Sequence, residues 1–298
     1  MKSIVSPFSR RLFPIIGTSA LVFFQSLEVL HAADAPAGGS AIREIAELNR
    51  AGFPVIDFHS HLKGGLTIEQ LLEHSRETGI RYGVAVNCGV GFPITNDVAA
   101  AQWFDGIKDQ PVFHAMQAEG REWVNMFSTE TIAKFDYVFT DAMTFTDQRG
   151  KRMRLWMTNE VEVTDAQAFM EMLVNKITGI MENEPIDIYV NATFLPEVIA
   201  TDYDKLWTPE RMDRVISAAV KNGIAIEIGA RYRIPSATFI KRAKAAGAKF
   251  SFGTNNSGPD LGRLEYCLDM IRECGLTPAD MFAPKPDGKK PIQLKKKI

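Results

Sequence analysis

Two histidines placed two residues apart give the sequence its clearest chemical signal. They end the apolar, β-branched run 55–61, VIDFHSH. Residues two apart on a strand point to the same side, so Asp57, His59 and His61 are expected on one face and the apolar residues between them on the other. Two converging imidazoles can bind a metal ion, with Asp57 or a backbone group orienting a ring through its other nitrogen. The alternative is that both histidines close a buried strand.

Two acidic residues further along the chain extend this candidate metal site. Glu119 precedes Gly120 at the expected end of a strand, and Asp141 follows the apolar run 137–140. Glu119 is a candidate ligand or a bridge between two ions. Asp141 is a candidate ligand, or the general base on a metal-bound water. The structural alternatives are an acid at a helix N-terminus for Glu119 and a turn-forming residue for Asp141.

Further strand ends carry neutral amides and arginines. Asn191 and Asn255 offer carbonyl oxygens that bind hard cations weakly and cannot take a proton, so we expect them to orient substrate or water. Arg231 and Arg233 are candidates for holding an anionic group, because guanidinium pairs well with phosphate or carboxylate. Surface or structural arginines are the alternative. Glu227, like Asp57, is expected to support the site from behind the ligands.

These side chains meet only if the strands that carry them run parallel. Strand-like and helix-like segments alternate to about residue 282, which predicts an α/β fold with helices covering a parallel sheet or barrel. Seven strands are expected, near residues 53–58, 82–87, 112–118, 136–140, 187–191, 224–229 and 249–253. Each ends in a polar group, and in parallel barrels functional groups gather at that rim.

Helix ends and one insertion are also readable. A hairpin is expected within residues 144–158, after the fourth strand. Helix boundaries are predicted by capping residues: Thr67 with Gln70, Thr164 with Gln167, and Thr208-Pro209 with a stop at Gly223.

The two ends of the chain differ from its middle. Residues 1–33 are typical of a signal peptide, with Arg10 and Arg11 fitting either a twin-arginine or an ordinary Sec signal. We expect a linker and N-terminal helix at 34–50, a single-domain barrel at 51–283 and a basic tail at 284–298. We therefore expect the protein to be exported, to the periplasm or the outside of a bacterial cell. We expect no stable membrane span once the signal peptide is removed.

Charge and cysteine content limit the choice of partners. The net charge is −2 for the whole chain, which gives no support for nucleic acid or anionic membrane as a partner. The expected partner is a small anionic substrate. The three cysteines, Cys88, Cys267 and Cys274, do not suggest a disulfide framework.

With these residues assembled, the chain resembles the PHP family of metal-dependent phosphoesterases, named for polymerase and histidinol phosphatase. The likeness covers residues 53 to 282, and its best pieces are DFHSH at 57–61, TIEQLLEHSRETGIRYGVAV at 67–86 and the run from Ile226 to Leu276. The resemblance implies a distorted (β/α)7 TIM-like barrel, which agrees with the strand count.

The resemblance carries only part of a ligand set. His59 and His61 match the family's first motif, and Glu119 falls where the family has a bridging glutamate. Elsewhere the family's histidines and aspartates are replaced, by Asn87-Cys88 after the second strand, by Asp141 or Met143 after the fourth, by Asn191 after the fifth and by Asn255-Asn256 after the last. The remaining set, His59, His61, Glu119 and Asp141, implies one ion or two, of manganese, iron, magnesium or zinc.

Two classes of function follow from these observations. The first is an exported divalent-metal-dependent hydrolase, phosphoesterase-like, in which a metal activates water; an amidohydrolase-type enzyme is the alternative within this class. The second is a non-catalytic PHP-like binding protein that kept the barrel and lost its chemistry, as the asparagine replacements suggest.

Overall fold

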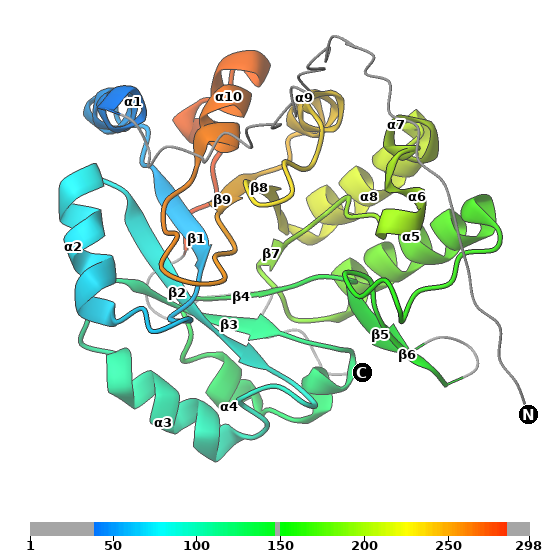
Figure 1. Ribbon diagram of the computed structural model, residues 1–298, viewed down its shortest axis with the longest axis horizontal. Helices are drawn as coiled ribbons and strands as arrows, with labels where there is room; N and C mark the ends of the chain where they lie inside the picture. The colour runs from blue at the N-terminus through cyan, green and yellow to red at the C-terminus, as the bar shows by residue number, and fades with distance from the viewer. Residues whose placement is uncertain (1–38, 147–149, 285–298) are drawn as a thin grey trace, which may run out of the picture. The chain divides into compact units, whose positions relative to one another are not determined.

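Seven parallel strands close into a barrel in the computed structural model, which describes residues 39–146 and 150–284 (Figure 1). In order around the barrel they are β1 (Ile56–Ser60), β2 (Arg81–Cys88), β3 (Phe113–Ala118), β4 (Tyr137–Thr140), β7 (Ile188–Tyr189), β8 (Ala225–Gly229) and β9 (Phe250–Gly253). Strand β9 pairs with β1 through Phe252 and Asp57, which closes the ring. The described residues belong to one compact unit. The predicted seven-stranded, single-domain α/β barrel is confirmed.

Helices surround the barrel on its outside (Figure 1). The longer ones are α1 (Gly39–Arg50), α2 (Ile68–Thr78), α3 (Asp97–Ile107), α5 (Ala166–Asn183), α8 (Pro209–Asn222), α9 (Ala237–Ala245) and α10 (Glu265–Cys274). Short turns of helix lie between them, at α4 (Thr129–Ile132), α6 (Glu197–Ala200), α7 (Tyr203–Leu206), η1 (Glu122–Asn125) and η2 (Pro278–Asp280). The order of strands and helices follows the alternation that the sequence predicts.

Capping side chains set most of the helix boundaries. Thr67 and Gln70 form the predicted capping box of α2, and Thr208 caps α8, which Gly223 ends in a left-handed conformation. The prediction for α5 is wrong, because Asp165 caps this helix in place of Thr164, accepting from the backbone N–H groups of Gln167 and Ala168. A carboxylate can bind two free backbone donors and also interacts favourably with the helix dipole.

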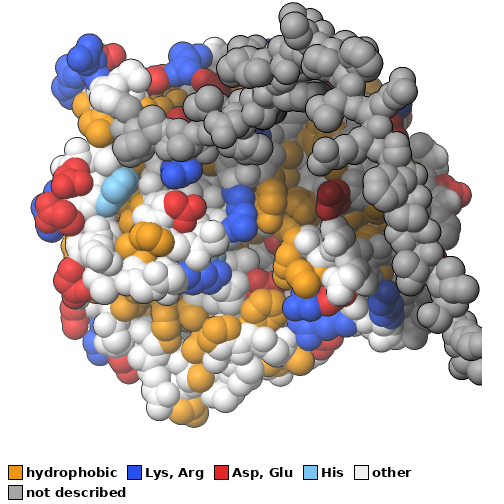
Figure 2. Space-filling model, viewed as in Figure 1, with side chains coloured by type: hydrophobic (Ala, Val, Ile, Leu, Met, Phe, Trp, Pro, Cys, Tyr) orange, Lys and Arg blue, Asp and Glu red, His pale blue; other side chains and the backbone are white. Residues whose placement is uncertain are grey.

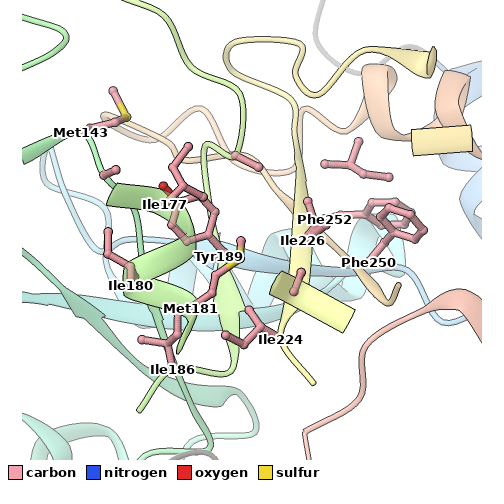
Figure 3. Close-up of a cluster of buried hydrophobic side chains, with 14 of the residues drawn as sticks. Met143, Ile177, Ile180, Met181, Ile186, Tyr189, Ile224, Ile226, Phe250 and Phe252 are labelled. Atoms are coloured by element: carbon pink, nitrogen blue, oxygen red, sulfur yellow. The ribbon is translucent and has the colours of Figure 1, made fainter. Parts of the chain in front are cut away.

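The core has two layers, one between barrel and helices and one inside the barrel. Figure 3 shows part of the outer layer, where Ile177, Ile180 and Met181 of α5 lie beside Ile186 and Tyr189. The inner layer consists of apolar side chains, namely Ile56, Phe58, Ala85, Ala115, Tyr137, Phe139, Ile188, Val190 and Ala225. These side chains pack inside the barrel, and functional groups in such barrels gather at the carboxyl ends of the strands.

The insertion after β4 is an antiparallel hairpin of β5 (Thr144–Thr146) and β6 (Arg152–Arg154), as the sequence predicts. Arg152 connects it to the loop after β2, because its guanidinium donates to the carbonyl of Val90 (2.8 Å). The hairpin therefore stands beside the carboxyl ends of β2 and β4.

The predicted signal peptide and nearly all of the predicted basic tail lie outside the described residues. Within 39–146 and 150–284, no helix has both the length and the apolar character needed to cross a membrane. On the face drawn in Figure 2, Lys and Arg side chains are interspersed with Asp and Glu.

Candidate functional site

A small polar pocket lies at the carboxyl ends of the barrel strands. Its volume is about 210 Å³. The side chains that line it come from every part of the rim and are Lys63, Asn87, Phe92, Gln117, Glu119, Asp141, Met143, Trp156, Asn191, Arg231, Tyr232 and Asn255. Five of the sequence-predicted site residues, Glu119, Asp141, Asn191, Arg231 and Asn255, are therefore brought together. His59 and His61 are fully buried beside them.

The end of β1 is irregular, and this changes the faces that the sequence predicts. Asp57 pairs with Tyr82 but Ser60 pairs with Val84, so β1 gains one residue over β2 between these positions. Such a bulge turns consecutive side chains toward the same side of a sheet. Phe58 belongs to the cluster inside the barrel, and the ring of His59 lies 4.6 Å from that of Phe139 in the same cluster. The expectation that Phe58 and His59 face opposite ways is wrong.

Because of the bulge, the side chain of Asp57 does not lie on the same side of β1 as the rings of His59 and His61. Asp57 is paired with Tyr82 and Phe252, whose side chains pack in the outer core layer. Its carboxylate accepts from the backbone N–H groups of His59 (3.1 Å) and Thr254 (3.0 Å). Asp57 therefore ties the end of β1 to the end of β9 and does not orient an imidazole.

Glu227 orients the ring of His59. The His59 Nδ1 atom lies 2.6 Å from Glu227 Oε1, and both side chains are about 1% exposed. The other carboxylate oxygen of Glu227 accepts from the backbone N–H of Asn191 (2.9 Å). Gly253 makes this approach possible, because a Cβ atom there would lie 2.1 Å from Glu227 Oε1 and 2.7 Å from the Cβ of His59. Glu227 is expected to support the candidate metal ligands, and its contact with the ring of His59 agrees with that expectation.

The ring of His61 is oriented by the backbone. Its Nδ1 atom lies 3.0 Å from the carbonyl oxygen of Ala85. Asn256 fixes the main chain at this residue, accepting from the His61 N–H (2.8 Å) and donating to its carbonyl (2.9 Å). Burial lowers the pKa of His61 well below its ordinary value of 6.5, with the charges of His59 and Lys63 adding to the effect. The ring is neutral at pH 7.

Both rings leave their second nitrogen unused. A backbone carbonyl only accepts, so Nδ1 of His61 carries the proton and Nε2 keeps a lone pair. The carboxylate of Glu227 likewise accepts at Nδ1 of His59, which leaves Nε2 as the nitrogen facing away from this contact. Both Nε2 atoms are buried and have no hydrogen-bond partner among the described residues, and the ring centroids are 5.3 Å apart. Imidazole nitrogens of this kind are the commonest metal ligands in proteins, so the two neighbouring rings offer a pair of candidate ligands.

The two carboxylates are held by asparagines. Glu119 accepts from the side-chain amide of Asn87 (2.8 Å), and Asp141 accepts from that of Asn191 (2.9 Å) and from the backbone N–H of Met143 (2.9 Å). Burial, and then the charge of Asp141, raise the pKa of Glu119 to about 8. Burial also raises the pKa of Asp141. Two buried acids that repel one another favour either a shared proton or a cation.

The ligand set is nevertheless incomplete as it stands. Within residues 39–146 and 150–284, no group of three His, Cys, Asp or Glu side chains is arranged to hold a metal ion. His59 and His61 supply two nitrogens, and a third protein ligand would have to come from Glu119 or Asp141, whose carboxylates keep lone pairs beyond their bonds to asparagine. The residues fit a metal ion on this condition.

Arg121, which the sequence analysis overlooks, joins the strands that carry the two acids. Its guanidinium donates to the hydroxyl of Thr140 (2.8 Å), the carbonyl of Asp141 (3.0 Å) and the carboxylate of Glu184 (2.7 Å). Glu184 also accepts from Trp123 Nε1 (2.7 Å). The signal available in the sequence is an arginine two residues after Glu119 within the run QAEGREW.

The two candidate arginines lie in different places. Arg231 lines the pocket and donates to the carbonyl of Asn255 (3.0 Å). Arg233 does not line it: its guanidinium lies 4.9 Å from the ring centroid of Tyr266, and a guanidinium nitrogen is 3.9 Å from Asp269. The structure therefore does not bring Arg233 to the candidate site.

A second pocket cation, Lys63, is missing from the sequence analysis. Lys63 lines the pocket, and partial burial lowers its pKa while the charge of Glu119 opposes that shift. Its signal in the sequence is that it continues the spacing of His59 and His61 by two more residues. Lys63 and Arg231 together make the pocket mouth attractive to anions.

Asn191 and Asn255 have a structural reason to be asparagines. Both have left-handed backbones, with φ of 50° and 51°, which Asn tolerates better than most residues. The backbone N–H of Asn191 donates to Glu227, and that of Asn255 donates to the carbonyl of His59 (2.8 Å). Asn191 directs its amide at Asp141, whereas Asn255 lines the pocket opening.

Comparison with known proteins supports the fold. No family model matches the sequence, and a search of curated proteins finds no match either. Among solved structures, the chain is similar to the histidinol phosphate phosphatase of Lactococcus lactis subsp. lactis, determined with zinc, L-histidinol and phosphate. The TM-score is 0.52 at 14% identity, over 75% of this chain and 94% of that one. The two chains share a barrel fold, in agreement with the fold that the PHP resemblance implies.

Proposed function

We propose that the protein is a divalent-metal-dependent hydrolase of the phosphoesterase type. The observation that carries this proposal is the pair of buried, unpartnered Nε2 atoms of His59 and His61. Their rings adjoin the pocket, because the backbone N–H of the pocket-lining Asn255 donates to the carbonyl of His59 (2.8 Å) and the ring of His61 lies 5.3 Å from that of His59. The likeness to a phosphatase crystallised with zinc and phosphate supports the same reaction class.

The ion would be held by His59 and His61 through Nε2, with Glu119 or Asp141 as a carboxylate ligand. Imidazole and carboxylate together suit zinc, manganese or iron, and magnesium where oxygen ligands dominate. A bound ion supplies Lewis acidity and makes water a stronger nucleophile near neutral pH. A single ion would need one of the two acids as a ligand, and a pair of ions would need both.

The remaining pocket residues handle the proton and the substrate. Asp141 accepts the proton of the attacking water, and its raised pKa makes it a stronger base than an exposed aspartate. Arg231 and Lys63 hold the anionic group of the substrate, with Asn255 beside them. Asn191 keeps Asp141 in place through its amide.

A second function is favoured by a separate observation. Among the described residues no three-ligand group exists, and both pocket acids, Glu119 and Asp141, already accept from an asparagine amide. A protein that binds a small anion and catalyses no reaction needs neither a complete metal-ligand set nor a free carboxylate. The enzyme and the binding protein differ in turnover, since either can hold a metal ion.

Turnover is tested with chelator-treated full chain, reconstituted separately with zinc, manganese, iron or magnesium. We expect hydrolysis of at least one member of a phosphomonoester and phosphodiester panel, and a loss of at least 100-fold in Asp141→Asn. Glu182→Gln, an exposed change on α5, serves as the control. Hydrolysis of amides alone supports the amidohydrolase alternative. Bound metal with no turnover on either panel supports the binding protein and contradicts the enzyme.

Export is a separate part of the proposal, carried by residues 1–33. Fusing this segment to a reporter that is active only outside the cytoplasm is expected to give signal in a bacterial host. Replacing Arg10 and Arg11 by lysine is expected to abolish export on the twin-arginine route and to spare it on the Sec route.

A further inference from the structure

The rim of the pocket is aromatic, in contrast to its polar floor. Phe92, Trp156 and Tyr232 line it together with Met143. These side chains come from three separate places, the loop after β2, the hairpin insertion and its flanks, and the loop after β8. Trp156 remains 39% exposed, although two other tryptophans, Trp123 and Trp207, are fully buried.

Contacts with neighbouring residues support the rings of Phe92 and Tyr232 and the backbone next to Trp156. The guanidinium of Arg152, in the hairpin, lies 5.9 Å from the ring centroid of Phe92. The backbone N–H of Leu155, next to Trp156, donates to the carbonyl of Met143 (2.8 Å). The ring of Tyr232 packs edge-on against Phe194 at 4.8 Å. The rim is therefore a supported surface.

Two cations share this pocket with the rings. Lys63 and Arg231 both line it, and their charges act on each other. The guanidinium of Arg231 lies 5.6 Å from the ring centroid of Tyr232. A ligand that enters the pocket thus meets aromatic faces and positive charge at once, which suits a molecule with a flat apolar part next to an anionic group.

From this arrangement we propose that the substrate is a small aryl-bearing anion, such as an aryl phosphate ester, whose ring packs against Trp156 while its anionic group meets Lys63 and Arg231. The pocket of about 210 Å³ limits the ligand to a single ring system, since pockets for drug-sized ligands measure about 300–1,000 Å³. The inference that the substrate carries an anionic group rests on the proposed function. The new parts are that the substrate also carries an aromatic ring and that Trp156 selects this ring.

The test compares two non-hydrolysable anions, phenylphosphonate and methylphosphonate, by calorimetric titration of the metal-supplemented full chain. We expect phenylphosphonate to bind about tenfold more tightly, the scale of one aromatic contact plus its buried area. Trp156→Ala is expected to reduce the ratio to below about threefold, and Trp156→Phe to retain most of it. Val98→Ala is the matched control, because Val98 is an exposed apolar side chain on α3 that does not line the pocket.

The outcomes separate this inference from the proposed function. Equal binding of the two phosphonates, or an unchanged ratio in Trp156→Ala, overturns the aryl preference and leaves the metal hydrolase standing. Binding of neither phosphonate contradicts the anion-holding role of Lys63 and Arg231, and the inference falls with it.

Discussion

The proton on each histidine ring determines what the pocket can bind. Glu227 and the carbonyl of Ala85 both act on Nδ1, which leaves Nε2 of His59 and His61 as the atoms that can donate electrons to a cation. Hydrogen-bonding partners of this kind fix the tautomer and raise the basicity of a metal-binding imidazole. The chemistry of the site thus depends on residues that do not touch the substrate.

Replacing Glu227 by Gln tests this dependence. The amide has one acceptor oxygen for the two donors, His59 Nδ1 and the Asn191 N–H, that the carboxylate serves. We expect metal affinity to fall by about 10–100-fold, the usual effect of losing such a partner. Calorimetric titration with zinc and manganese measures it, and Glu182→Gln is the control. An affinity equal to that of the wild type would show that Glu227 does not support the site.

Glu119 makes the stability of the metal-free protein depend on pH. Its pKa rises from an ordinary 4.5 to about 8, so the folded protein holds this proton more tightly than the unfolded chain. The resulting stability is complete below pH 4.5 and is lost as the pH rises through about 8. We expect wild type to lose a few kcal/mol more than Glu119→Gln between pH 5 and pH 8, at about 1.4 kcal/mol per pKa unit.

Urea unfolding in the presence of a chelator, at both pH values, measures that difference. The Gln side chain keeps the size and a hydrogen-bond acceptor for Asn87 but cannot ionise. Identical changes in the free energy of unfolding for the two proteins would contradict a raised pKa at Glu119.

At the scale of the elements, the close packing of β8 against β9 makes the His59–Glu227 contact possible. Gly253→Ala would place a Cβ atom 2.1 Å from Glu227 Oε1. We expect this change to lower the free energy of unfolding by about 1–3 kcal/mol, as is usual for overpacking, and to weaken metal binding. Denaturant titration gives the first value and calorimetry the second.

Gly179→Ala on α5 is the matched control for Gly253→Ala. A Cβ atom at Gly179 meets nothing within 4 Å, and alanine stabilises a helix interior by about 0.5–1 kcal/mol relative to glycine. Both substitutions replace glycine by alanine, but we expect Gly253→Ala to lower the free energy of unfolding and Gly179→Ala to raise it. A Gly253→Ala protein as stable as the wild type would mean that Glu227 can move away from His59 at no cost.

The same elements mark the limit of prediction from sequence. Strict alternation along residues 55–61 predicts the histidine pair correctly as neighbours, but it cannot reveal the bulge in β1, which depends on how that strand pairs with β2. For the same reason Asp57 is expected at the histidines and is found at Thr254. Capping of α5 by Asp165 reflects competition between adjacent residues, which spacing rules do not resolve.

For the whole molecule, the alternation of strands and helices was sufficient to predict the barrel. The rim was predictable in part, because any polar residue at the end of a parallel strand arrives there, as Glu119, Asp141 and Arg231 do. The direction in which a side chain points could not be predicted from the sequence. Arg233 lies after a turn and points to Asp269, whereas Lys63, which lies in a loop, lines the pocket. The position of Arg121 near Glu119 is visible in the sequence, but its ion pair is not, since its partner Glu184 lies 63 residues away.

Direct metal binding tests whether His59 and His61 together bind a divalent metal ion in this pocket. Chelator-treated full chain is titrated with zinc and with manganese, and bound metal is measured after gel filtration. We predict at least one ion per chain for the wild type and for His74→Ala, whose imidazole bonds Tyr82 outside the pocket. We predict none for His59→Ala/His61→Ala. Absence of bound metal in the wild type, or equal binding by the double variant, would contradict the account.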